Sequence, residues 1–182
     1  TRIERDPSVL VFAGRCYDGE NLPYQALDDL IDHIGEYFRR LSRHRVERLL
    51  PRNFAILVKM FPVLGPFLPN DTRSAADLNS FELRTRALAA LRELLGRLSE
   101  RNRIVLAIDD LQWGDIDGCA ALNDLVTAPD SPPILVVLAH RSEDAGFAPS
   151  LAALRGTTCE DAARSPVSIQ LDHLDDSESR QL

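Results

Sequence analysis

The sequence predicts an α/β fold in which a parallel sheet is covered by helices on both faces, giving three layers. Two observations lead to this prediction. Strand-like and helix-like segments alternate along the second half of the chain, and the strand-like segments are continuously apolar. A strand that is apolar on both sides is buried on both sides, which requires helices above and below the sheet. The length of 182 residues suits one globular domain.

The chain is expected to open with one strand and one helix. The apolar run SVLVFAGRC at 8–16 predicts a buried strand. Pro23 suits the first position of a helix, and apolar residues recur after it at helical spacing. These features predict a helix over 23–42.

A largely helical insert is expected next. Residues 43–78 contain a helix-forming stretch at 53–61 and then several prolines, so we predict an irregular segment there. Asn79, followed three positions later by Glu82, resembles a capping box. It predicts the start of a long amphipathic helix that reaches about residue 101.

The second half provides the alternation of strands and helices. Asp115 precedes an apolar helical pattern and is expected to be its N-cap. The predicted strands are 103–109, 133–140 and 167–171, and the predicted helices are 116–127, 147–155 and a last one that begins after Asp175.

Composition argues against several classes of protein. A net charge of -7 argues against a broad surface for nucleic acid or anionic lipid. No apolar run reaches the roughly 18 to 20 residues of a membrane span. The three cysteines have neither the spacing of a zinc site nor an even number for a disulfide framework. We therefore predict a cytoplasmic protein that binds neither nucleic acid nor membrane directly.

The stretch with the clearest chemical meaning is the apolar run Val105–Ile108 followed by Asp109 and Asp110. Such a run delivers two carboxylates to the rim of a sheet, where they can meet Mg²⁺ and a nucleotide phosphate. This is a Walker B arrangement. One acid would hold Mg²⁺ and its neighbour would orient the attacking water. The alternative is that the two aspartates only cap the following turn.

Four segments of the chain carry a family resemblance. IVLAIDDLQWGD resembles the Walker B segment of the signal-transduction ATPases with numerous domains, the STAND class of AAA-related P-loop proteins. These proteins occur in large bacterial serine/threonine kinases, cyclases and LuxR-type regulators. The other three segments resemble parts of the same domain in the same order: VFAGRCYDGENLPYQALDDLI, ILVVLAHRSED and LDHLDDSESRQL.

The resemblance implies roles for three residues. Asp109 would bind Mg²⁺, and Asp110 would be the water-activating acid beside the bound nucleotide. Arg141 matches the polar sensor position, where a guanidinium could contact a γ-phosphate. A surface ion pair of Arg141 with Glu143 or Asp144 is the alternative.

The phosphate-binding loop of this family is missing from the sequence. Lys59 is the only lysine, and the apolar, helix-like stretch just before it contains no glycine. The G-x4-G match at Gly14 is followed by an acid, Glu20. We expect the loop and its central strand to precede Thr1. Strand 167–171 would then shift to pair with 133–140, or two chains would meet at that edge.

The family implies an ATP- and Mg²⁺-dependent switch module, an ATPase, within a multidomain signalling protein. Residues 1–182 would be a partial P-loop NTPase-like domain that lacks the central Walker A strand. It would comprise a strand and helix (1–42), a helical insert (43–102), and the Walker B, sensor 1 and last strands (103–182). We expect this chain alone to bind neither ATP nor Mg²⁺. Its expected partners are the nucleotide, fused kinase, repeat or regulatory domains and, in a homo-oligomer, further copies of itself. The alternative is a degenerate, non-hydrolysing interaction scaffold.

Overall fold

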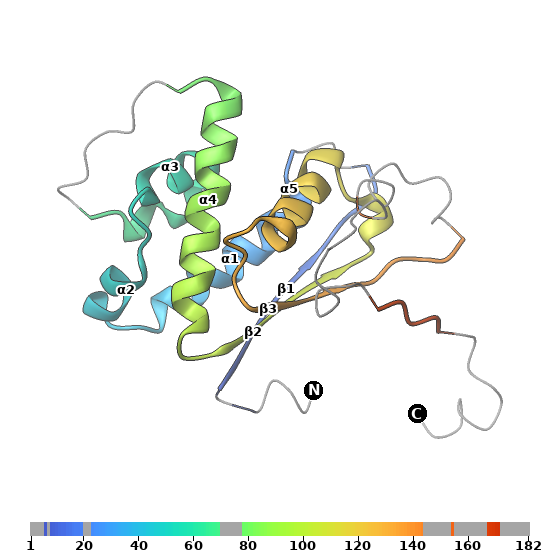
Figure 1. Cartoon of the computed structure of the whole chain (residues 1–182), viewed down its shortest axis with the longest axis horizontal. Helices are drawn as coiled ribbons and strands as arrows, with labels where there is room; N and C mark the ends of the chain where they lie inside the picture. Colours follow the sequence, from blue (N-terminus) through green and yellow to red (C-terminus); the bar gives the residue numbers. More distant parts are fainter. Residues whose placement is uncertain are drawn as a thin grey trace.

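The centre of the molecule is a sheet of three parallel strands, β1 (Val9–Arg15), β2 (Arg103–Asp109) and β3 (Ile134–Leu138), in the order β1-β2-β3 (Figure 1). The computed structural model describes residues 6, 8–19, 23–69, 78–143, 154 and 167–171. The last residues of β1 and β2, Arg15 and Asp109, are paired in the register. The carboxyl ends of the strands therefore meet at one edge of the sheet.

The helices follow the strands in two crossovers. Between β1 and β2 lie α1 (Gln25–Arg39), α2 (Arg43–Leu49), α3 (Phe54–Met60), the 3-10 helix η2 (Pro62–Phe67) and α4 (Ser80–Ser99); between β2 and β3 lie the 3-10 helix η3 (Leu111–Trp113) and α5 (Ile116–Thr127). Consecutive strands are neighbours, so right-handed crossovers place both sets of helices on the same face. In Figure 1, α1, α4 and α5 lie together on that face. The predicted α/β fold, a parallel sheet flanked by helices, is confirmed.

The two faces of the sheet differ in burial. On the face under the helices, Phe12, Leu106 and Ile108 are buried. On the opposite face, Leu135 and Val137 remain 59% and 47% exposed. The second helical layer that the sequence predicts is thus not seen in the part of the chain that the structure describes. The predicted helix at 147–155, apart from Leu154, and the one after Asp175 lie outside the described residues.

Two predicted helix caps are confirmed. The Asn79 side chain accepts a hydrogen bond of 2.9 Å from the Glu82 N–H at the start of α4. Asp115 likewise caps α5, whose bounds match the prediction. The insert is more regular than predicted, because residues 43–49 form the additional helix α2. None of the helices described is long and apolar enough to cross a membrane.

The prediction of a strand at 167–171 is wrong. These residues are described without regular structure, and Val167, Ile169 and Leu171 are 79% to 87% exposed. Alternating apolar residues form a strand only where a neighbouring strand pairs with their backbone groups. Among the described residues, β3 pairs with β2 alone, so its outer edge has not gained the expected partner.

Candidate functional site at the carboxyl ends of the strands

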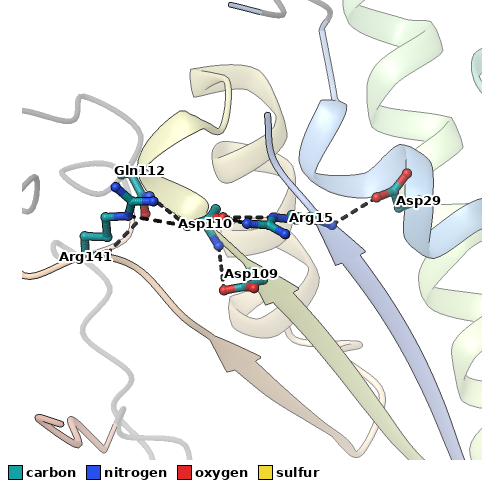
Figure 2. A network of polar contacts seen from close by, with 6 residues as sticks. All are labelled: Arg15, Asp29, Asp109, Asp110, Gln112 and Arg141. Atoms are coloured by element: carbon teal, nitrogen blue, oxygen red, sulfur yellow. Dashed lines mark hydrogen bonds and ion pairs between the residues drawn. The ribbon is translucent and has the colours of Figure 1, made fainter. Parts of the chain in front are cut away.

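The polypeptide leaves the sheet through a tight turn at Asp109 and Asp110. Asp110 has φ 51° and ψ 38°, a left-handed conformation that aspartate adopts more readily than most residues. Asp109 Oδ1 accepts a hydrogen bond of 2.9 Å from the Asp110 N–H, and the Leu111 N–H donates to the Ala139 carbonyl at 3.0 Å. The turn consequently directs the two adjacent carboxylates differently (Figure 2).

Asp110 lies between two arginines that come from the neighbouring strands. Arg15, the last residue of β1, donates to Asp110 Oδ2 from Nε at 2.8 Å and from Nη2 at 2.5 Å. On the other side, Arg141 Nε lies 3.9 Å from Asp110 Oδ1, just beyond β3 (Figure 2). The ends of all three strands thus contribute a charged group to one cluster, which brings together Asp110 and Arg141, two of the predicted site residues.

Electrostatics keep Asp110 ionised. The hydrogen bond from Arg15 is the main cause that lowers the pKa of Asp110 below its ordinary value, and a bond from Gln112 adds to it. The same pair raises the pKa of Arg15. Gln112 Nε2 donates to Asp110 Oδ1 at 3.0 Å, while Gln112 Oε1 accepts the Arg141 N–H at 3.2 Å. Gln112 therefore connects the carboxylate to the segment after β3.

Sequence reasoning assigned no role to Arg15, Gln112 or Asp29. Helix α1 fixes the backbone of Arg15, because the main-chain N–H of Arg15 donates to Asp29 Oδ2 at 3.0 Å. Arg15 and Asp110 are 95 positions apart in sequence, so only the pairing of β1 with β2 brings them together. A charged residue at the end of a predicted neighbouring strand was the one available signal.

A family model described as an AAA ATPase domain matches residues 1–137. The chain belongs to this family. The matched region contains β1, β2, both aspartates and Arg15, whereas Arg141 lies just beyond it. No significant match was found among curated proteins or among solved structures. Membership indicates a nucleotide-binding ATPase module.

The acidic residues of this AAA ATPase domain suit Mg²⁺ better than a softer metal. Mg²⁺ is commonly held by one or two carboxylates, with waters and substrate phosphates completing its shell. Asp109 is exposed at the end of β2, and its side-chain Oδ1 accepts a hydrogen bond from the Asp110 N–H. The described residues contain no cluster of three or more metal-ligating side chains. A single open carboxylate at the sheet edge fits this mode of binding.

The cations near the two aspartates are arginines. Lys59, the only lysine of the chain, belongs to α3, which packs on α4 and η2. Figure 1 places α3 among the insert helices, on the far side of α4 from the ends of the strands. The cations at the site are therefore the guanidinium groups of Arg15 and Arg141.

Two buried thiols lie near the site. The Cys16 N–H donates to the Asp109 carbonyl at 3.0 Å, and Cys119 lies on α5. Burial raises the pKa of Cys16 to about 11 and that of Cys119 to about 12. Both thiols are protonated at neutral pH and serve as small apolar groups.

Proposed function

We propose that the cluster at the strand ends is the acidic half of an ATP- and Mg²⁺-dependent switch. The observation that carries the proposal is the position of Asp110 between Arg15 and Arg141, beside the open carboxylate of Asp109. Asp109 would hold Mg²⁺, which neutralises charge on the phosphates when bound. Asp110 would orient the attacking water, and Arg141 would contact the γ-phosphate.

The contact with Arg15 makes this arrangement a resting one. A carboxylate whose pKa is lowered by a guanidinium is a weak base, and Asp110 Oδ2 already accepts two hydrogen bonds from Arg15. Phosphate oxygens compete with carboxylates for guanidinium groups. An arriving triphosphate that attracts Arg15 would free Asp110 for water, so binding and activation would be linked.

A role within a larger signalling protein completes the proposal. The resemblance to STAND proteins supports a module whose state changes the contacts of fused kinase, repeat or regulatory domains. Such modules act through the rearrangement of loops and domains that nucleotide binding produces. A chain without a phosphate-binding loop is expected to bind ATP poorly, and we propose that these 182 residues alone do not hydrolyse it.

The test compares ATP turnover and Mg²⁺-dependent ATP binding in this chain and in a version extended at its N-terminus. We expect turnover in the extended version only. In that version, Asp109→Asn should remove the dependence on Mg²⁺, and Asp110→Asn should preserve binding but abolish turnover. Asp117→Asn is the matched control, because Asp117 is an exposed acid of α5 whose side chain pairs with Arg84. Strong turnover by the 182-residue chain itself would refute the reasoning from Lys59.

A non-hydrolysing interaction scaffold is the second candidate. It is supported by the engagement of Asp110 with Arg15 and by the location of Lys59 on α3. The deciding observation is whether the residues upstream of Thr1 contain G-x4-G-K-[ST]. An extended version that has no such motif and binds no ATP would favour the scaffold.

A further inference from the structure

Asp115 begins α5 and lies in the same short connection as Asp110. Its backbone is extended, with φ -78° and ψ 154°, and its Oδ1 accepts the Gly118 N–H at 2.6 Å. This is ordinary N-cap geometry, which satisfies one of the unpaired N–H groups of a helix start. By itself it would stabilise α5 alone.

The same oxygen also accepts a hydrogen bond from the start of α1. The Tyr24 N–H donates to Asp115 Oδ1 at 3.0 Å, although the two residues are 91 positions apart. Tyr24 immediately precedes α1 in a left-handed conformation, with φ 67°. Its carbonyl accepts the N–H groups of Leu27 and Asp28, so it forms the first turn of α1. One carboxylate oxygen thus serves two helix N-termini, where their dipoles favour its negative charge.

The two helix starts approach each other very closely at this carboxylate. A Cβ atom added to Gly118 would lie 2.5 Å from Asp115 Oδ2 and 3.3 Å from the Cβ of Ala26 in α1. Asp115 Oδ2 is buried and accepts no hydrogen bond from the described residues. The geometry therefore leaves Asp115 little freedom to move away from either helix.

The connection from Asp110 to Asp115 is short and is held at both ends. At its beginning, the Leu111 N–H bonds to the Ala139 carbonyl after β3; at its end, Asp115 bonds to Tyr24. Leu111–Trp113 form η3 between these points and carry Gln112, which contacts Asp110. A shift of the start of α1 would be passed directly to this connection.

We propose that Asp115 is a positioning residue that fixes the connection carrying Asp110 and Gln112 against the start of α1. Asp115 itself would touch neither nucleotide nor metal. The importance of Asp115 for the site rests on the proposed function, whereas the contact of Asp115 with both helix starts is independent of that function. A test that uses no nucleotide can therefore be decided whether or not the domain hydrolyses ATP.

Amide hydrogen exchange, followed by NMR on the 182-residue chain, tests the proposal. In Asp115→Ala we expect the amides of Tyr24, Gly118 and Leu111 to exchange roughly tenfold faster, the size expected for loss of a helix cap. Asp115→Asn keeps an acceptor oxygen and should retain protection at all three. The matched control is Asn79→Ala, which removes the cap of α4 and should expose only the Glu82 amide.

The outcomes decide the proposal in either direction. Faster exchange of Gly118 alone in Asp115→Ala, with Tyr24 and Leu111 unchanged, would reduce Asp115 to a local cap and overturn it. If Asp115→Ala does not fold, the amide proton shifts of Asp115→Asn decide, because a neutral oxygen is a weaker acceptor than a carboxylate. Joint upfield shifts of the Tyr24 and Gly118 amide protons would support the shared contact. A shift of Gly118 alone would exclude it.

Discussion

Replacement of Gly118 by alanine should destabilise the domain, although helix propensity alone predicts the opposite. Alanine is favoured over glycine in a helix by about 1 kcal/mol. The new Cβ would lie 2.5 Å from Asp115 Oδ2, so the carboxylate would have to rotate and release the N–H groups of Tyr24 and Gly118. Loss of these two contacts costs roughly 2 to 4 kcal/mol. The expected net loss is about 1 to 3 kcal/mol.

Gly96 provides the matched control for this substitution. It lies within α4, and a Cβ added there would meet nothing within 4 Å. Gly96→Ala should therefore stabilise the domain by about 0.5 to 1 kcal/mol. Urea unfolding followed by circular dichroism measures the free energy of unfolding of both variants. In thermal unfolding, a chain of this size should shift its Tm by about 2 to 4 °C per kcal/mol. Stabilisation by Gly118→Ala equal to that by Gly96→Ala would refute the close contact with Asp115.

Three further predictions concern charge and pH. Arg15→Gln should raise the pKa of Asp110 toward its ordinary value, measured by ¹³C NMR of the carboxyl group, because the guanidinium lowers it. The domain should lose stability as the pH rises from 9 through 11 to 12, which urea unfolding measures. The thiols of the unfolded chain ionise near pH 9.0, whereas folding raises the pKa of Cys16 to about 11 and that of Cys119 to about 12. Arg92→Lys should lower the free energy of unfolding by about 1 kcal/mol in the same assay, because one ammonium group cannot replace both contacts of Arg92, with Asp124 in α5 and with Asp130 after it.

Each of these predictions has a control and a contradicting result. The Arg15–Asp110 pair stabilises the folded domain above the ordinary Asp pKa of 3.8, and this stabilisation is lost as the pH falls through the lower pKa that Asp110 has in the folded state. Arg15→Gln should therefore reduce the loss of stability at acid pH. An unchanged titration would contradict the pairing. A double Cys→Ala variant should lose less stability at alkaline pH than the natural chain. Arg43→Lys, in an ion pair whose Arg43 side chain is 77% exposed, should have little effect. A loss equal to that at Arg92 would argue against a special role for the two contacts of the partly buried Arg92.

The parts of the fold that depend on local patterns could be predicted from the sequence. β2 and α5 have the predicted bounds, because a continuous apolar run ends in charge at Asp109 and Asp115 is a strong N-cap. α2 was missed since Val46 is its one buried residue, and an Arg43–Glu47 ion pair supports a helix with almost no apolar pattern.

The parts that depend on distant partners could not be predicted in the same way. The segment 167–171 has a strand-like pattern, but no sequence pattern says which edge is available to it. Within the site, Asp109, Asp110 and Arg141 were identified from motif and resemblance, and the structure brings them together. Arg15 escaped notice because its partner is 95 positions away. Its role as a resting contact for Asp110 depends on strand register, which periodicity does not specify.

The parallel pairing of β1 with β2 also has a consequence for how the domain folds. All of α1 to α4 lies between these strands, so the pair closes a long loop before it gains any contact. Helices of the insert can form locally and early, whereas the Arg15–Asp110 contact and the Tyr24–Asp115 contact require this closure. The charged cluster can accordingly form only once β1 and β2 have paired. Formation of the helices alone would leave the chain without a strand-end site.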